Sequence, residues 1–379
     1  MICVKAGAAC GALAAFGHGR LGDSDGEAPA PLAASGEAIS MKPMILARAL
    51  AGMAVLAALG IAMPMARAAS PLQGDLLIAD RGGGYLLAVN PAKHVAWSQH
   101  LTWKSPTGIH SKWADDAFLT PDHRHIIFNE EDNQAIDIMS IATGRITWTY
   151  GHPGVKGAAP GYLNTPDDAF QLPDGTVETS DIVNQRVIFI DPKTKRIIRQ
   201  YGTTGKRGHA PPRLLNAPDG AYPTPDGGLL ITEIGWGHGT TSYLDGVSPA
   251  GKLDYSIRTD MTYASDGNVT PHGNVIVVDY QKPGAIEIYS PAGKVLWRYR
   301  PTAGVGELNH PSNAVVLPNG KILVCDDWND RVMVIDRASQ SIVWSYGHLG
   351  VARNAPGYLN IPDEVVFVPS AWHVNWTKR

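Results

Sequence analysis

The chain has 379 residues, with 32 lysines and arginines against 35 aspartates and glutamates, which gives a formal net charge of −3. This near balance lacks the basic field that nucleic-acid binding requires, so we expect no nucleic-acid partner. Glycine and proline contribute 41 and 28 residues, and charged residues only 18%, where about 25% is usual. An excess of turn-forming residues with few charges indicates an all-β protein of many short strands.

The N-terminal part differs in composition from the rest. Residues 1–40 are rich in alanine, glycine and serine without a helical or strand period, which predicts a disordered extension or a mis-assigned start ahead of Met41. Residues 41–68 combine a basic start, an apolar run and Ala66-Arg67-Ala68, the three parts of a secretory signal peptide. The apolar run is too short to span a membrane. We therefore expect cleavage after Ala68, a periplasmic or secreted protein, and no stable membrane insertion afterwards.

Residues 69–379 repeat one unit. A turn proline recurs every 46 to 52 residues, at Pro121, Pro173, Pro225, Pro271, Pro318 and Pro369. This period is typical of a propeller blade of four strands. The clearest copy, residues 310–346, contains four strand-like runs, and the first of them ends in the hairpin signal Pro-Asn-Gly.

The two ends of the repeat region complete one another. Residues 74–100 hold the second, third and fourth strands of a unit, and residues 361–369 form a first strand with nothing after it. Joined, they make one blade and remove the exposed edges that an open sheet would leave. The sequence therefore predicts a six-bladed β-propeller over residues 69–379, with four-stranded blades, a ring closed by the C-terminal strand that completes the first blade, and a monomeric state.

Two copies share a longer pattern. In residues 311–336 and 166–191, a Pro-x-Gly turn is followed by Asp-x-x-Asn-x-Arg-Val. This pattern resembles the NHL repeat. The family includes protein- and RNA-binding modules as well as enzymes similar to peptidyl amidating lyases, so the resemblance implies a propeller fold more than a function. The fourth copy departs from the pattern, because Gly235-Trp236-Gly237-His238-Gly239 replaces the Asp-x-x-Asn-x-Arg turn.

Two other families share shorter fragments. Residues 142–148 and 293–297 are similar to parts of the quinoprotein tryptophan-docking repeat, but those dehydrogenases are longer and have more blades, so we expect no quinone cofactor. Bacterial arylsulfotransferases are also similar around the turns, but their channel histidine and arginine are replaced here by aspartate, asparagine or glycine. The glycine-rich residues 81–84 precede a strand rather than a helix, which argues against a nucleotide site.

The candidate site lies five residues before each turn proline. In blade order these positions hold Glu364, Asp116, Asp168, Gly220, Asp266 and Asn313. The first strand of every propeller blade lines the central channel, so these side chains should meet near one mouth of it. Like charges that lie close together raise each other's pKa unless a cation compensates. All-oxygen ligands suit a hard ion, Ca²⁺ before Mg²⁺. The predicted metal ligands are Asp116, Asp168, Asp266, Asn313 and Glu364.

A second interpretation of these residues stays open. An aspartate between a proline and a strand often caps a turn through its own backbone. The neighbouring positions fit that role, and they hold Asp363, Asp115, Asp167, Asp219, Ser265 and Ser312.

No catalytic residue can be assigned from the sequence. His152, His209 and His348 occupy connectors between blades, where a surface position is expected, and none has zinc-site spacing. Trp236 and His238 lie in the glycine-rich insertion. We expect an exported binding module that takes a polypeptide, a glycan or a small molecule through its loop face and central channel. The alternative is a calcium-dependent hydrolase or lyase with its site at the channel mouth.

Overall fold

The computed structural model describes residues 70–105, 108–111, 113–235 and 241–378, with side chains described outside residues 103–112. The predicted extension and signal peptide lie outside these residues, and so do Trp236 and His238. From Ser70 onward the described chain forms one compact unit. Within the described ranges, no helix is long and apolar enough to cross a membrane.

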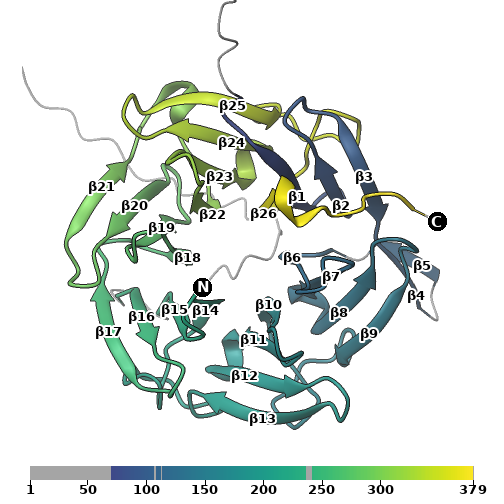
Figure 1. The fold of residues 1–379 in the computed structure, drawn as a ribbon. Helices are drawn as coiled ribbons and strands as arrows, with labels where there is room; N and C mark the ends of the chain where they lie inside the picture. The colour runs from purple at the N-terminus through teal and green to yellow at the C-terminus, as the bar shows by residue number, and fades with distance from the viewer. Residues whose placement is uncertain (1–69, 106–107, 112, 236–240, 379) are drawn as a thin grey trace, which may run out of the picture. The chain divides into compact units, whose positions relative to one another are not determined.

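Six antiparallel sheets of four strands each surround one central axis (Figure 1). Blade 1 contains β26 (Pro362–Pro369), β1 (Gly74–Asp80), β2 (Tyr85–Val89) and β3 (Val95–His100). Blade 2 contains β6 (Ala117–Leu119), β7 (His125–Glu130), β8 (Ala135–Ser140) and β9 (Ile146–Gly151). Blade 3 contains β10 (Pro166–Gln171), β11 (Val177–Asp181), β12 (Arg186–Asp191) and β13 (Arg196–Tyr201).

The second half of the ring follows the same order. Blade 4 contains β14 (Pro218–Pro223), β15 (Leu229–Glu233), β16 (Tyr243–Val247) and β17 (Leu253–Arg258). Blade 5 contains β18 (Ala264–Val269), β19 (Val275–Asp279), β20 (Ala285–Tyr289) and β21 (Val295–Tyr299). Blade 6 contains β22 (Pro311–Val316), β23 (Ile322–Asp326), β24 (Arg331–Asp336) and β25 (Ser341–Gly347). A separate hairpin contains β4 (Thr102–Ser105) and β5 (Gly108–Ser111).

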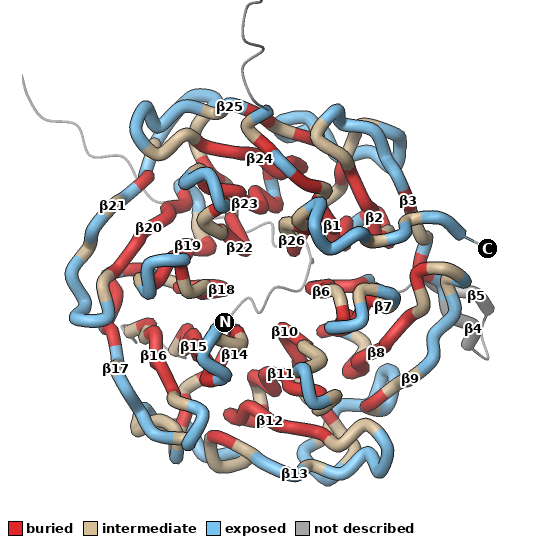
Figure 2. The backbone as a smooth tube through the Cα atoms, in the orientation of Figure 1, coloured by how far each residue is buried: buried red, intermediate tan, exposed pale blue. Residues whose placement is uncertain are grey.

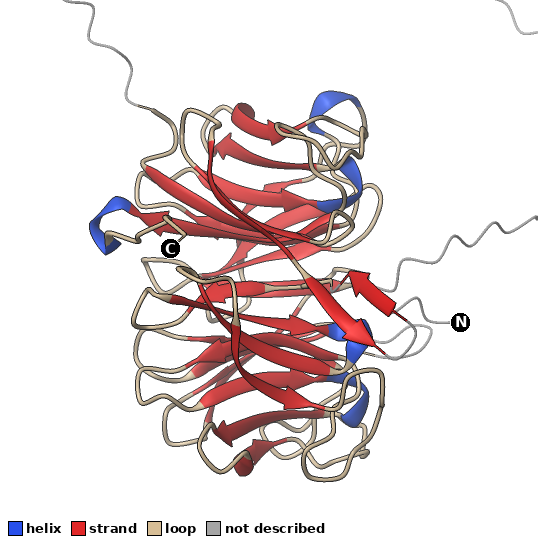
Figure 3. Ribbon diagram, turned by 90° about the vertical axis from the view of Figure 1, so that its right-hand side faces the viewer, coloured by secondary structure: helices blue, strands red, loops and turns tan. Residues whose placement is uncertain are grey.

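The predicted six-bladed fold is confirmed, including the way in which the ring closes. β26 pairs antiparallel with β1, from Gly74 opposite Pro369 to Asp80 opposite Pro362. The last strand of the chain is therefore the innermost strand of blade 1. This pairing covers the edge of β1 and leaves every blade with the same four-stranded order. Viewed from the side, the strands stack as layers, and the short 3-10 turns sit at their ends (Figure 3).

Buried apolar residues of neighbouring blades pack together in shared clusters. Exposed residues lie mainly on the outer strands and turns (Figure 2). The aromatic residues of the outermost strands belong to this core, since Tyr150 and Tyr346 are 2% and 3% exposed. Four tryptophan indoles also donate hydrogen bonds of 2.8–3.2 Å to a carbonyl of the next blade: Trp97 to Ile141, Trp148 to Pro192, Trp297 to Arg337 and Trp344 to Pro91. These aromatic residues thus join neighbouring blades.

The Asp-x-x-Asn-x-Arg pattern joins a blade to the connector that precedes it. In blade 3, Asp181 accepts hydrogen bonds from Arg186 Nε at 2.7 Å and from Asn184 Nδ2 at 2.8 Å. The arginine also donates to the carbonyls of Ala158 and Tyr162. Asp326, Asn329 and Arg331 make the corresponding bonds in blade 6. The pattern therefore has a structural role, since it replaces backbone pairing for a connector that lies over the blade.

The innermost strands carry a bulge at the candidate positions. In β10 the pairing with β11 shifts between Asp167 and Phe170, so that Asp168 lies within the irregular stretch with a φ of 46°. Equivalent shifts lie at Gly220 and Asp266. A bulge re-aims side chains and ends regular pairing. The channel-lining side chains are thereby displaced from the regular alternation of the strand.

Deletion of residues 361–379 should remove β26 and leave β1 with an open edge. We expect this variant to melt at a much lower temperature than the parent or to lose its cooperative transition, measured by circular dichroism. Deletion of residues 370–379 is the control, because it starts after β26 and removes contacts made outside that strand, among them the packing of Trp376 on Trp97, its hydrogen bond to Asp75 and the stacking of Trp372 on His123. Equal melting temperatures for the two variants would contradict the role of ring closure.

Asp80 makes the blade 6 to blade 1 junction sensitive to pH. Its carboxylate accepts a hydrogen bond from Asn360 N at 2.6 Å, while burial and the nearby Asp330 raise its pKa to about 7. A carboxyl whose pKa is raised on folding stabilises less as pH rises from about 4 to about 7. The Asp80→Asn variant cannot titrate there. Its melting temperature should therefore equal that of the parent near pH 4 and exceed it at pH 8; a difference independent of pH would contradict this.

Candidate functional site

The channel brings together four of the five predicted metal ligands. Carboxylate oxygens of Asp116, Asp168, Asp266 and Glu364 lie within 4.8 Å of one another, and all four residues are fully buried. They come from the innermost strands of blades 1, 3 and 5 and from the residue that precedes β6 in blade 2. We refer to these four carboxylates as the channel cluster.

Asn313, the fifth predicted ligand, contacts the channel cluster through its amide nitrogen. Its Nδ2 donates a hydrogen bond to Glu364 Oε1, and its Oδ1 accepts one from Asn268 Nδ2 at 2.8 Å. The Asn313 oxygen is thus directed toward blade 5 rather than into the cluster. In this arrangement Asn313 orients Glu364 instead of offering a ligand oxygen.

Two further side chains orient the cluster. Tyr222 donates its hydroxyl to Glu364 Oε2 at 2.9 Å, and Asn129 Nδ2 donates to Asp116 Oδ2 at 3.1 Å. The other oxygen, Asp116 Oδ1, is buried and accepts no hydrogen bond from the residues that the structure describes. Gly220 allows the close approach of Asp168, because a Cβ there would lie 2.7 Å from Asp168 Oδ2. The cluster therefore combines fixed carboxylates with an oxygen that is not satisfied.

The residues beside the cluster are also acidic and buried. Asp115 and Asp363 form a second close group with Asp116, and Asp167 and Asp219 form a third with Asp266. All four of these neighbours are fully buried. Hydrogen bonds at these positions connect blades: Asp219 accepts from Tyr263 and from Ser265 in the next blade, at 3.0 and 3.1 Å, and Ser312 Oγ donates to the carbonyl of Asp363.

One arginine offsets part of this negative charge. Arg81 Nη1 lies 2.5 Å from Asp115 Oδ1 and 4.0 Å from Asp363 Oδ1, and its Nη2 lies 3.2 Å from Glu131 Oε2. Burial would lower the pKa of Arg81, but these carboxylates outweigh it and raise that pKa. Arg81 therefore stays charged and compensates the charges of Asp115, Asp363 and Glu131. Among the described residues it makes no ion pair with the channel cluster.

The remaining charge raises carboxyl pKa values. Burial, followed by repulsion from Asp116 and Asp266, raises the pKa of Glu364 well above its ordinary value, although the bonds from Asn313 and Tyr222 oppose the change. Burial also raises the pKa of Asp115, against the effect of Arg81. Such a cluster either retains protons at neutral pH or binds a cation that takes their place.

A layer of mostly apolar side chains lies two residues further along each innermost strand. These residues share the channel-facing side, since all of them line one pocket. The layer consists of Phe118, Phe170, Tyr222, Asn268, Val315 and Val366. Its aromatic rings touch, with 4.0 Å between the centroids of Phe118 and Phe170 and 5.0 Å between those of Phe170 and Tyr222.

All six residues of this layer line one pocket of about 440 Å³. The turn residues Pro121 and Pro173 also line it, together with Trp372, whose indole stacks on His123 at 4.5 Å. Glu364 and Asn313 border the pocket as well, although they are 0% and 2% exposed. The channel is therefore layered along its axis, with the buried acids followed by an apolar pocket.

Several of these residues were not predicted as parts of the site. Arg81 stands in the glycine-rich residues 81–84, and nothing in the local sequence pairs it with Asp115 or Glu131. Tyr222 could have been found, because it stands two residues after Gly220 just as Phe170 stands two residues after Asp168. The position two residues after each candidate site residue therefore predicts the apolar layer.

The connector histidines lie away from the channel cluster. His152 stacks on Tyr162 and His348 on Tyr358, with 4.0 and 4.1 Å between ring centroids. His209 stacks on Tyr243 at 3.7 Å and also approaches Glu233 and Asp245. The first two agree with the surface role expected from the sequence, since they lie in exposed connectors.

Comparison with known proteins supports the fold alone. No family model matches the chain, and no curated protein matches its sequence. The chain is similar to the crystal structure of a protein of unknown function from Bacteroides caccae, with a TM-score of 0.53 and 16% identity over 76% of this chain and 97% of that one. A streptogramin B lyase structure gives a TM-score of 0.49 at 15% identity, covering 75% of this chain and 82% of that one.

A structure of a nidogen/laminin complex gives a TM-score of 0.49 at 15% identity, covering 72% of this chain and 92% of the matched chain. At such identities the likeness concerns architecture and assigns no activity.

Proposed function

We propose that this protein is a ligand-binding propeller, in which a calcium ion held by the channel cluster fixes the blades and the pocket beneath it takes a small apolar or aromatic molecule. The observation that carries the proposal is the meeting of four fully buried carboxylates from four blades within 4.8 Å. Export of residues 69–379 after removal of the signal peptide belongs to the same proposal and rests on the sequence.

The charge balance supports a cation. The channel cluster and its four acidic neighbours bring eight carboxylates together. Among the described residues, Arg81 pairs with the neighbours Asp115 and Asp363 and not with the cluster itself. A hard divalent ion prefers carboxylate oxygens, and calcium tolerates irregular ligand arrangements better than magnesium does. Asp116 Oδ1 supplies an oxygen that accepts no hydrogen bond from the described residues, and the lack of a side chain at Gly220 lets Asp168 Oδ2 lie close to its backbone. Asp116, Asp168, Asp266 and Glu364 are the proposed ligands, and Asn313 orients Glu364.

The burial of the ligands favours a structural ion over a catalytic one. A catalytic ion needs a coordination position that substrate or water can reach. The four proposed ligands have no exposed surface, and Glu364 alone among them borders the pocket. We therefore propose binding rather than the alternative of calcium-dependent hydrolysis or elimination.

The lining of the pocket indicates its ligand class. Concave sites with aromatic walls and a few polar groups typically bury small molecules. Phe118, Phe170, Tyr222 and Trp372 supply the aromatic surface here, while Asn268 supplies an amide at the border. The pocket carries little charge of its own, so a neutral or weakly charged aromatic molecule fits it best.

Calcium should stabilise the parent protein. At a concentration of 100 times the dissociation constant, binding to the folded state alone contributes about 2.7 kcal/mol, which corresponds to a rise of several degrees in melting temperature. Asp168→Asn should lose most of this rise, yet melt at or above the parent in the presence of chelator, because it removes repulsion. The measurement is thermal melting of both proteins with excess calcium and with chelator, together with metal analysis.

Asp174→Asn is the matched control for this experiment. Asp174 is exposed and caps its own turn by accepting a hydrogen bond from Thr176 N at 2.9 Å. It should keep the full calcium-dependent rise. A parent without any calcium-dependent shift, or an Asp168→Asn variant that responds to calcium as the parent does, would overturn the channel site.

The pocket should bind single- and double-ring aromatic fragments, detected by saturation-transfer NMR. Trp372→Ala should weaken this binding because its indole lines the pocket. Trp328→Ala is the control: both tryptophans lie in a 3-10 turn, are 40–49% exposed and stack on a histidine, but Trp328 does not line the pocket. Equal losses in the two variants, or no binding by the parent, would contradict the proposal.

A further inference from the structure

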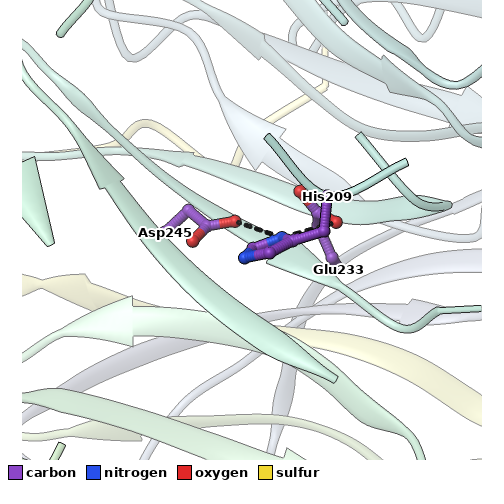
Figure 4. A group of neighbouring side chains, drawn as sticks. All are labelled: His209, Glu233 and Asp245. Carbon is purple, nitrogen blue, oxygen red and sulfur yellow. Dashed lines mark hydrogen bonds and ion pairs between the residues drawn. The ribbon is translucent and has the colours of Figure 1, made fainter. Parts of the chain in front are cut away.

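A second group of potential ligands lies in blade 4, away from the channel cluster. His209 comes from the connector between β13 and β14, Glu233 ends β15, and Asp245 lies within β16. The two carboxylates flank the imidazole from adjacent strands, and both approach the same ring nitrogen (Figure 4). His209 Nδ1 is 3.3 Å from Glu233 Oε2 and 3.8 Å from Asp245 Oδ2.

The contact of His209 Nδ1 with Glu233 is a long hydrogen bond that also has the spacing of two ligands on one ion, and its 3.8 Å distance to Asp245 is beyond hydrogen-bond reach. A good N–H···O bond measures about 2.7–3.2 Å, and one ring nitrogen carries one proton to share between two carboxylates. Ligands at about 2.0–2.1 Å from a tetrahedral ion lie roughly 3.3–3.4 Å apart. We propose that His209 Nδ1, Glu233 and Asp245 bind a divalent transition-metal ion of the zinc type.

The surroundings of the histidine match those of a metal ligand. A histidine bound to metal through one nitrogen usually donates its other N–H to an oxygen, which fixes the ring. His209 Nε2 lies 3.3 Å from Ser256 Oγ on β17, and the ring stacks on Tyr243 at an interplanar angle of 15°. Nδ1 is thereby held toward the two carboxylates.

The charge of the group also calls for a cation. Glu233 and Asp245 are fully buried; Glu233 Oε2 accepts a hydrogen bond from Asn216 N at 2.9 Å, and Oε1 accepts none from the described part of the chain. Among the residues that the structure describes, no lysine or arginine pairs with either carboxylate. A divalent ion with a neutral imidazole would balance the two charges. The His209 side chain is 27% exposed, which gives the ion a path from solvent.

The donor set separates this site from the channel cluster. An imidazole nitrogen favours zinc and other transition ions, whereas the all-carboxylate channel suits calcium. His152 and His348 occupy comparable connectors and stack on tyrosines in the same way, but in the described part of the chain neither joins a group of metal-ligating side chains. His209 therefore differs from its counterparts by the two acids beneath it.

The test uses the purified full chain, stripped with chelator and then kept in excess calcium so that the channel cluster does not compete. Cobalt(II) is titrated in and followed by its visible absorption, and zinc is followed by thermal melting. We expect one equivalent of cobalt to bind, zinc to displace it, and calcium to leave it in place. Asp168→Asn should behave like the parent, because it alters only the channel cluster.

Variants of the group decide the assignment. Asp245→Asn should lose the cobalt band and weaken zinc binding by more than the roughly 10- to 100-fold that loss of an outer partner costs. It should fold without metal, because it removes a repulsive charge and keeps the volume. His209→Gln should also lose binding, while His348→Gln should retain it.

Three results would overturn the proposal. The first is a parent that binds neither cobalt nor zinc at equimolar concentration, and the second is a set of variants that bind as the parent does. The third is labelling of Ser256 by an activated phosphonate in a metal-free protein, abolished by His209→Gln. That result would instead make Ser256, His209 and the acids a nucleophile, base and orienting group.

Discussion

Closure of six sheets around one axis is the constraint on which the rest of this structure depends. Because β26 pairs with β1, the innermost strand of every blade must face the same narrow channel. Residues that lie about fifty positions apart in the sequence are thereby brought within a few ångströms. The acids of blades 1, 2, 3 and 5 meet for this reason, and no local preference of any single blade would bring them together.

The fold tolerates these acids by combining several compensations. Arg81 pairs with Asp115 at the outer side of the channel, while Tyr222 and Asn313 donate to Glu364 at the inner side. The raised pKa of Glu364 shows that hydrogen bonds alone do not offset burial and repulsion. Buried like charges persist only where protons or a cation complete the balance, so the channel is poised to respond to both.

Blades of similar sequence acquire different chemistry through their connectors. His152, His209 and His348 stack on tyrosines in similar ways, yet only the strands beneath His209 present a pair of acids among the described residues. The same principle holds in the channel, where Gly220 takes the position that an acid occupies in four of the other blades. A repeat protein can thus place individual sites on a uniform framework, because blade packing depends on the apolar faces and leaves connector and channel positions unconstrained.

The sequence by itself determined the number of blades, their four strands and the closure by residues 361–369. It also determined the equivalent strand positions from which Asp116, Asp168, Asp266 and Glu364 converge on the channel. Each follows from periodicity, because a repeat of fixed length places equivalent residues at equivalent points of the ring. Only the tertiary structure decided that Asn313 turns its oxygen toward Asn268, that Arg81 reaches Asp115, and that His209 meets Glu233 and Asp245. These contacts join residues that do not occupy equivalent positions of the repeat, and packing rather than the repeat period sets the direction of a side chain and the course of a connector.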